Sequence, residues 1–248
     1  MKFENTEVWG FEHAIRGMRN PLESWSKSDS EFSAIVNGMC KLGDNDLKLM
    51  KRLITSGAEH RKFMRQIFIS VDITAPLYWW KEFDTYKIGT TANSTSTMHK
   101  LTSRPITIDC FEIDDYNPDL EFEHDIDDTG DTPFEYECRV EDAVGICETE
   151  YYDLETIIGF LESLRQRYLK TKDKRYWKEL VRWLPESWLQ TRTVTMNYEN
   201  IYTMVHQRYT HKLNEWSGKD DPWHENFVSW ARSLPYAKDL IFWDLEES

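Results

Sequence analysis

The chain has 248 residues, enough for one large domain or two small ones. Its 11 Trp, 12 Tyr and 12 Phe exclude a disordered chain, which would have far fewer aromatic residues. The formal net charge is −14, but twelve acidic residues and no Lys or Arg lie between Phe111 and Glu137, which leaves 32 acidic and 30 basic residues elsewhere. The net charge therefore does not exclude an anionic ligand.

The first predicted elements are two helices and a strand. "SDSE" at Ser28 to Glu31 has capping-box spacing, which predicts a helix to about Leu42. From Asp44, apolar residues recur at helical spacing until Gly57, which predicts a second helix. In residues 67–74, Ile and Val alternate with Phe, Ser, Asp and Thr, which is typical of a strand with one buried face.

An aromatic segment and a polar run follow. Pro76 suits a first helical turn, and Leu77 to Ile88 is predicted to be a helix that is buried or lines a pocket. Five small polar residues then begin at Asn93 and are closed by Met98 and His99. Such residues are common in caps and turns. The alternative, which we favour with the resemblance below, is a loop that faces a ligand.

The second half predicts an acidic insertion and four helices. The acidic segment contains turn signals such as Asn117-Pro118, so we expect a solvated insertion over about residues 108–150. Amphipathic helices are predicted at residues 154–168, 176–184, 198–205 and 227–234. No internal repeat is present. We expect one mostly helical α+β domain over residues 1–248.

Several classes of site and location are excluded by missing patterns. The ten glycines are never within four residues of one another, which excludes dinucleotide and P-loop motifs, and neither C-x-x-C nor G-x-S-x-G occurs. We expect no metal site. No apolar run approaches the ~20 residues of a membrane helix. The four cysteines are too few and too irregularly spaced for a disulfide scaffold, which indicates free thiols in a soluble cytoplasmic protein without membrane contact.

Cationic residues flank the aromatic segment and the helix at 198–205. They are Lys81, Lys87, His99, Lys100, Arg104, Arg182, Arg192, Arg208, His211 and Lys212. Arginine grips phosphate through two parallel hydrogen bonds, and hydroxyl groups of a polar run complete such a site. Solvated charges on helix faces remain the alternative interpretation.

The order of residues adds a resemblance. "SGAEHRKFMRQIFISVDITAP" precedes the aromatic helix and then Lys87-x-x-Thr90-x-x-Asn93-x-x-Ser96-x-x-His99. Later, "VRWLPESWLQTRTVTMNYENIYTMVHQRYTHKLNEW" has Arg before Leu-Pro, then Asn, Arg eleven residues on, a nearby His and a closing Trp. The two blocks, roughly half the chain, resemble the flavin-dependent thymidylate synthase (ThyX) family, which has a Gly-His-Glu turn, a strand, an Ala-Pro helix and an R-H-R-x-x-S-x-N-E-x-S-x-R-Y signature.

The resemblance implies a fold and site residues. The fold would be ThyX-like, mostly helical around a small antiparallel sheet. Ser96 and Arg208 would be catalytic. The nucleotide contacts would come from Arg182, Arg208, Thr95, Ser96 and His99. The flavin contacts would come from Lys87, Thr90, Asn93, Asn197, His211 and Tyr86, with Trp80 as a further stacking ring; core packing is the alternative for both aromatic rings.

This sequence also departs from the family pattern. Thr85-Tyr86-Lys87 stands where the family has Arg-His-Arg. Ser94 and Met98 replace the signature's glutamate and last arginine, and only His60 can stand in for the turn histidine. Other residues must therefore supply the contacts of the lost arginines, or one ligand has changed.

The resemblance implies one-carbon transfer from methylenetetrahydrofolate to C5 of dUMP, with reduced FAD as hydride donor and NADPH as a possible reductant. It also implies a homotetramer and no direct contact with nucleic acid. No enzyme nucleophile is required, because the cofactors carry the chemistry. Two alternatives stay open: a hydroxymethylase that makes a modified DNA precursor, and a non-catalytic nucleotide-binding or interaction protein on a degenerate synthase scaffold.

Overall fold

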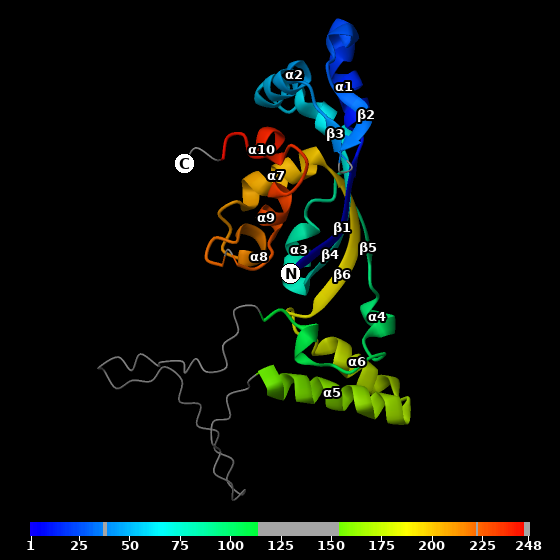
Figure 1. The fold of residues 1–248 in the computed structure, drawn as a ribbon. Helices are drawn as coiled ribbons and strands as arrows, with labels where there is room; N and C mark the ends of the chain where they lie inside the picture. Colours follow the sequence, from blue (N-terminus) through cyan, green and yellow to red (C-terminus); the bar gives the residue numbers. More distant parts are fainter. Residues whose placement is uncertain (37–38, 114–153, 222, 246–248) are drawn as a thin grey trace, which may run out of the picture. The chain divides into compact units, whose positions relative to one another are not determined.

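The computed structural model of the protein describes residues 1–36, 39–113, 154–221 and 223–245 (Figure 1). The chain forms two compact units. Unit 1 comprises Met1–Arg104, Cys110–Glu112 and Pro185–Ser248, and unit 2 comprises Pro105–Asp109 and Ile113–Leu184. The extent of the domain, predicted as residues 1–248, stays a prediction. Most of the acidic insertion lies outside the described residues.

The centre of unit 1 is a four-stranded antiparallel sheet in the order β1-β4-β6-β5. Its strands are β1 (Lys2–Trp9), β4 (Phe68–Pro76), β6 (Leu189–Asn197) and β5 (Thr91–Ser94). β4 and β6 pair along their whole length, from Phe68 opposite Asn197 to Pro76 opposite Leu189. Alternate residues of β4 face the core, where Ile69, Val71 and Ile73 are at most 1% exposed. The predicted strand and its buried face are confirmed.

Helices of unit 1 cover one face of this sheet (Figure 1). They are α3 (Leu77–Phe83), α7 (Tyr198–Arg208), α8 (Asn214–Ser217), α9 (Phe227–Arg232) and α10 (Ala237–Leu240). Stacked rings fill the space beneath them: Trp79 lies 4.4 Å from Trp216 and 5.2 Å from Phe83, measured between ring centroids. Aromatic pairs of this kind contribute about 0.5–1.5 kcal/mol beyond their buried area. The aromatic segment is therefore buried, as predicted.

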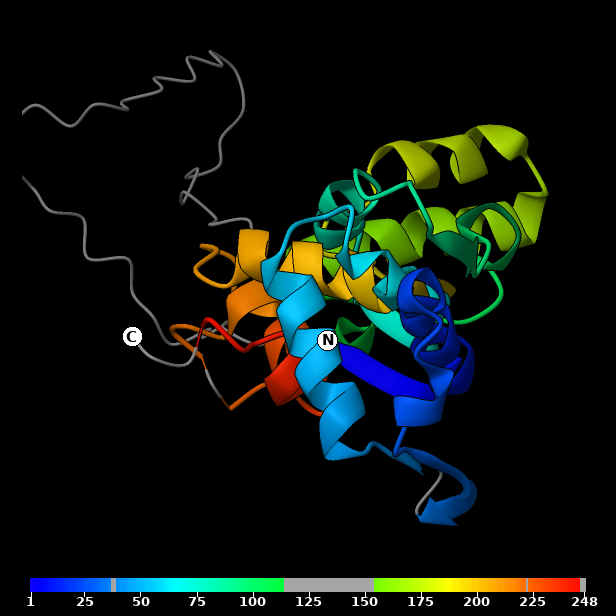
Figure 2. The same cartoon turned by 90° about the horizontal axis from the view of Figure 1, so that it is seen from above.

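The N-terminal part of unit 1 is a set of short elements. They are α1 (Phe11–Arg19), η1 (Asn20–Leu22), η2 (Trp25–Lys27), β2 (Glu31–Val36), β3 (Met39–Lys41), α2 (Asp44–Thr55) and η3 (Arg61–Gln66). α2 lies beside α10, with which it is in contact (Figure 2).

The helix predicted from Ser28 to Leu42 is wrong, because Ser28 and Ser30 make other bonds. Both hydroxyls donate to Asp46 Oδ2 at 2.7 Å, and Arg19 Nε donates to Oδ1 at 2.6 Å. Burial alone would raise the pKa of the Asp46 carboxyl. The hydrogen bonds from Ser30, Ser28 and Arg19 together lower this pKa by more than burial raises it, so it lies below its ordinary value. This long-range cluster overrides the local capping signal, and Glu31 begins a strand.

Unit 2 contains α5 (Leu154–Thr171) and α6 (Lys174–Arg182). Asp173 caps α6 by accepting a hydrogen bond from Arg175 N at 2.9 Å. In α5, the Glu162 carboxylate accepts from Arg165 Nε at 2.8 Å, Arg165 Nη2 at 2.9 Å and Ile106 N at 2.9 Å. These bonds, chiefly that from Arg165, lower the pKa of Glu162 to about 2 although partial burial opposes them.

Most predicted helices are confirmed: α2, α5, α6, α7 and α9 lie where periodicity placed them. α3 is shorter than predicted, because it ends at Phe83 rather than Ile88. Two small elements complete the described chain, α4 (Thr97–Lys100) and η4 (Ile108–Cys110). The predicted class, a mostly helical α+β fold around a small antiparallel sheet, is confirmed. Among the described residues, no helix has the length and apolarity to cross a membrane.

Candidate functional site

Most of the residues that the resemblance selects within unit 1 lie in a cluster around Arg208 or in two pockets. Arg208 lies at the end of α7, opposite the end of α3. Its Nη1 lies 2.9 Å from Glu82 Oε2, and its Nε donates to the Tyr86 hydroxyl at 3.0 Å. The guanidinium is also 5.1 Å from the centre of the Trp216 ring. We call Glu82, Tyr86, Arg208, His211 and Trp216 the Arg208 cluster.

Glu82 forms an ion pair with Arg208 and also lies beside His211. Its Oε2 atom is buried and lies 3.4 Å from His211 Nε2 as well as next to Arg208. The geometry is that of ion pairs, because within the described residues this oxygen accepts no hydrogen bond. Tyr86 in turn donates its hydroxyl to Gln207 Oε1 at 2.9 Å. The predicted residues Arg208, His211 and Tyr86 are thus brought together, but a carboxylate that the sequence did not single out already balances the charge of Arg208.

The Lys87 pocket has a volume of about 440 Å³. It is lined by Arg65, Thr85, Tyr86, Lys87, Ile88, Gly89, Asn197, Glu199, Asn200 and Thr203. Arg65 is ion-paired with Glu199. For Lys87, the described residues provide no such partner.

The two asparagines of the Lys87 pocket hold the backbone. Asn197 caps α7 by accepting from Asn200 N at 3.1 Å, and Asn200 Nδ2 donates to Ile88 O at 2.7 Å. Gly89 has φ +80°, and a Cβ there would lie 2.8 Å from Asn197 Nδ2, so glycine is required at this close approach. Asn197 is therefore a residue that shapes the pocket, and the signal for its role was its position directly before a helix.

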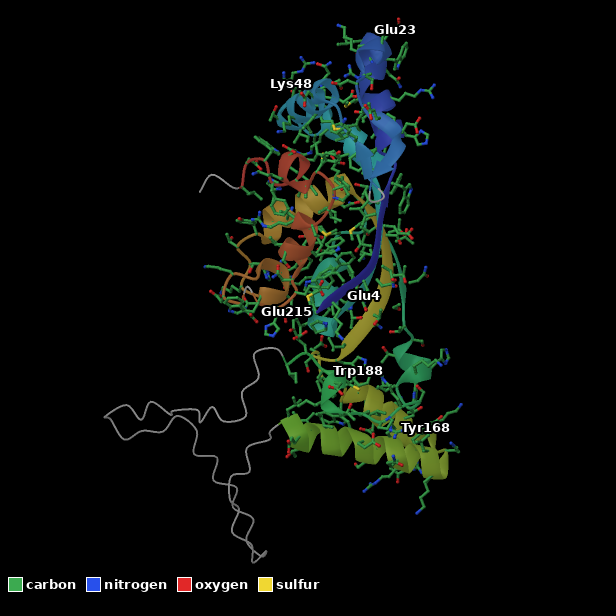
Figure 3. The ribbon with its side chains drawn as sticks, in the orientation of Figure 1. Glu4, Glu23, Lys48, Tyr168, Trp188 and Glu215 are labelled. Carbon is green, nitrogen blue, oxygen red and sulfur yellow. The ribbon has the colours of Figure 1, made fainter. Side chains whose placement is uncertain are left out.

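The second pocket, which we call the Ser96 pocket, has a volume of about 300 Å³. It is lined by Thr95, Ser96, Thr97, Lys100, Leu101, Ser103, Arg104, Trp188, Leu189 and Thr191. Trp188, which precedes β6, is labelled in Figure 3. The predicted residues Thr95 and Ser96 thus share a cavity with Lys100 and Arg104, two of the flanking cations that the sequence analysis considered for phosphate binding but that the family resemblance did not select.

The polar run at Asn93 is not the predicted loop. Thr91–Ser94 forms the edge strand β5, in which Asn93 pairs with Thr193 and is exposed. Ser96 then caps α4, because its Oγ accepts from His99 N at 3.2 Å. The prediction failed because small polar side chains suit a strand edge paired to the Thr-rich β6 as well as they suit a loop.

Three other selected residues lie apart from these groups. Thr90 donates its hydroxyl to Tyr86 O at 2.5 Å and so fixes the turn after α3. Arg182 belongs to unit 2, where it forms an ion pair with Glu179. Trp80 is 1% exposed and donates its indole N–H to Gln190 O at 2.9 Å. Trp80 is a core residue, so the stacking role considered for it is wrong.

A third pocket lies among α1, η1, η2 and α2 and has a volume of about 800 Å³. Its apolar lining includes Met18, Leu22, Leu49 and Leu53, and its basic residues are Arg19, Lys27, Lys48, Arg52 and His60; Lys48 is labelled in Figure 3. Arg19 is engaged by Asp46. His60, the substitute for the family's turn histidine, is therefore a pocket residue. Such a lining suits a partly apolar, anionic ligand.

The fold decides which known structures the chain resembles. No protein-family model matches the chain, and no curated protein sequence matches it significantly. A crystal structure of flavin-dependent thymidylate synthase ThyX from Helicobacter pylori, complexed with FAD and dUMP, aligns with a TM-score of 0.58 over 97% of this chain and 98% of that one, at 15% identity. The chain has the ThyX fold.

A second ThyX structure from the same organism, with FAD and dUMP, covers 100% of both chains with a TM-score of 0.59 at 14% identity. The ThyX signature can be aligned with the polar run in two registers. Counted from Lys87 without a gap, its second serine falls on Thr95, so the match to Ser96 requires one extra residue. Thr95 and Ser96 both line the Ser96 pocket, so either alignment places a hydroxyl residue in this pocket.

Proposed function

We propose that the protein is a flavin-dependent enzyme of the thymidylate synthase type. It would bind FAD and dUMP and transfer a one-carbon unit from methylenetetrahydrofolate to C5 of the pyrimidine. The observation that carries the proposal is the ThyX fold along the whole chain, together with pockets lined by the residues that the resemblance selects.

The Lys87 pocket fits the phosphate part of a flavin cofactor. Lys87 offers three donors with no carboxylate partner among the described residues, and Tyr86 lines the same pocket. Charge-assisted hydrogen bonds of this kind are about twice as strong as neutral ones. Bound FAD, once reduced, would supply a hydride. This chain's residues would hold its phosphates through Lys87 and fix the surrounding backbone through Asn197.

The protein's own contribution is to position the ligands. Ser96 and Thr95 would contact the nucleotide through their hydroxyl groups. Arg208 and His211 would contact its charged groups only with the donor atoms that do not face Glu82. Asn93, Thr90, His99 and Arg182 keep the roles predicted for them as proposals. No cysteine is needed as a nucleophile, because the reaction type relies on cofactors and orientation.

The test is flavin retention followed by product analysis. The purified full-length chain is mixed with FAD, dialysed and scanned for flavin absorbance, with the heat-unfolded chain as control. Retained flavin is expected. The holoprotein is then given dUMP, methylenetetrahydrofolate and NADPH, and dTMP is measured by chromatography. Absence of both retained flavin and dUMP binding would overturn the proposal.

The same assay separates the alternatives. A hydroxymethylated nucleotide, or conversion of deoxycytidine monophosphate, would identify a hydroxymethylase or a cytosine-directed enzyme. A second candidate, a non-catalytic nucleotide-binding protein, is favoured by one observation: the charge of Arg208 is already neutralised by Glu82. It predicts nucleotide binding without retained flavin and without product.

A further inference from the structure

The Ser96 pocket carries two cations that no carboxylate of the described residues neutralises. Lys100 and Arg104 line the pocket together with five hydroxyl residues, Thr95, Ser96, Thr97, Ser103 and Thr191. Among the described residues, the lining includes no Asp or Glu. Within the part of the chain that the structure describes, neither cation forms an ion pair. The pocket is therefore positive and already contains hydrogen-bond donors, which favours an anionic ligand.

Other cations near β6 and α3 differ in this respect. Arg208 Nη1 lies 2.9 Å from Glu82, Arg192 Nη1 lies 2.7 Å from Asp84, and Lys81 Nζ lies 2.7 Å from Glu186. A ligand phosphate would have to compete with a carboxylate at each of these. At Lys100 and Arg104, residues 1–36, 39–113, 154–221 and 223–245 provide no competing carboxylate.

The wall of the Ser96 pocket is fixed by backbone and amide contacts. Gln190 Nε2 donates to Thr95 O at 3.1 Å and to Thr97 Oγ1 at 3.2 Å. Thr95 N donates to Thr191 O at 2.8 Å, which ties the segment to β6. Behind it, Leu101 and Trp188 are 2% and 7% exposed and form an apolar back wall. Hydroxyls on a supported wall are pre-organised for binding.

We propose that Lys100 and Arg104 bind the phosphate of the nucleotide, a phosphomonoester dianion, in the Ser96 pocket. They would supply the charge of the signature arginines that this chain lacks. The inference rests on the proposed function, because it names the residues that hold the phosphate of that substrate. Arg104 would offer a planar fork and Lys100 a point charge. The Ser96 hydroxyl accepts from His99 N and keeps its own O–H for the phosphate.

The pocket's size agrees with this assignment. A volume of about 300 Å³ is at the lower end of the ~300–1,000 Å³ typical of small-molecule sites, so it suits the phosphate and part of the sugar rather than a whole dinucleotide. The base would lie outside this cavity. Specificity for the nucleotide over the nucleoside would therefore depend on the two cations.

The test compares dUMP, deoxyuridine and inorganic phosphate by calorimetric titration of the FAD-loaded full-length chain. The variants are Lys100→Met and Arg104→Gln, with Arg104→Lys to restore charge. The matched control is Arg16→Gln, an exposed cation on α1 that is outside every pocket described above. Thermal unfolding of each variant establishes that it is folded.

Each neutral variant is expected to lower affinity for dUMP about tenfold, the effect of losing one charge-assisted contact, and to leave affinity for deoxyuridine within about twofold. Arg104→Lys should recover part of the loss. Inorganic phosphate should compete with dUMP in the wild type and less well in the variants, which separates the phosphate contact from base recognition.

Three results would overturn the assignment. If both variants bind dUMP like the wild type, the phosphate is held elsewhere and the proposed function is untouched. If the variants lose deoxyuridine and dUMP equally, the two cations serve the structure and not the phosphate. If the wild type binds no deoxyuridine nucleotide at all, the proposed function fails and this inference fails with it.

Discussion

Two cationic regions of unit 1 differ in what neutralises them. In the Arg208 cluster, one buried carboxylate oxygen of Glu82 faces both Arg208 and His211. In the Ser96 pocket, Lys100 and Arg104 share a lining with hydroxyl residues and, in the part of the chain that the structure describes, with no carboxylate. The difference teaches that a residue at a matched sequence position does not necessarily offer its charge to a ligand. In the Ser96 pocket, the available charges belong to two residues that the family matching left out.

Three arginine–carboxylate ion pairs of the protein differ in how far their side chains are buried. The side chains of Arg19 and Asp46 are 4% and 0% exposed, those of Arg165 and Glu162 are 7% and 27%, and those of Arg208 and Glu82 are 19% and 32%. The energetic importance of each pair should fall in that order, because solvent screens exposed charges.

The most buried pair gives the largest expected effect. Asp46→Ala leaves Arg19 buried without its partner and also removes the acceptor of Ser28 and Ser30. We expect the free energy of unfolding to fall by about 3–5 kcal/mol. Urea unfolding measures it. The control Asp44→Ala, an exposed residue in the first turn of the same helix, should cost about 0.3–1 kcal/mol. Equal losses for the two variants would contradict the role of burial.

The intermediate pair gives a pH-dependent effect in unit 2. The folded-state pKa of Glu162 is lowered from 4.5 to about 2. The unfolded chain therefore binds the proton first as pH falls, so this contribution is fully present above about pH 4.5 and is lost on acidification toward pH 2. We expect a loss on the order of 2 kcal/mol, less than the full shift implies because the group is partly exposed.

The measurement is the unfolding free energy of wild type minus that of Glu162→Gln from pH 7 to pH 2.5. The difference should shrink with acidification. Glu155→Gln, at an exposed residue in the first turn of the same helix, is the matched control and should cost no more than about 0.3–1 kcal/mol at pH 7. A pH-independent difference for Glu162→Gln would show that Arg165 is not its charge partner in solution.

The least buried pair gives the smallest effect and tests the comparison directly. Glu82→Gln removes the carboxylate that competes for Arg208 and His211. We expect affinity for dUMP to rise about fivefold, while stability falls by no more than about 1 kcal/mol. Titration with dUMP checks this. Glu186→Gln, which unpairs Lys81 instead, should leave affinity unchanged. Weaker binding by Glu82→Gln would show that Arg208 needs its carboxylate to be positioned.

The sequence predicted those helices and strands whose buried residues recur at a regular spacing. The alternation in β4 and the apolar faces of α5, α6 and α7 were readable because each buries a regular set of side chains. β6 was missed because Arg192 occupies a core-side position opposite Ile73. Its guanidinium stacks 4.2 Å above the Trp80 ring and pairs with Asp84, which makes burial of a cation tolerable. No local sequence signal contains these partners.

The site shows the same division. Sequence order brought forward Ser96, Thr95, Lys87 and Asn197, which the structure finds lining pockets. It could not foresee that Glu82, on another helix, neutralises Arg208, or that Gln190 fixes the wall beside Thr95. These contacts join residues about a hundred positions apart, and periodicity carries no information at that range.

The pairing of β4 with β6 has a consequence for synthesis. Asp72 and Thr193 are 121 positions apart, yet they face each other in the sheet. At about 5–20 residues per second, a ribosome needs roughly 6–24 s to make the intervening chain. During that time β4, with its apolar face, has β1 on one side and an unpaired edge on the other, which is a template for aggregation. Expression yield should therefore depend on chaperones that bind nascent chains.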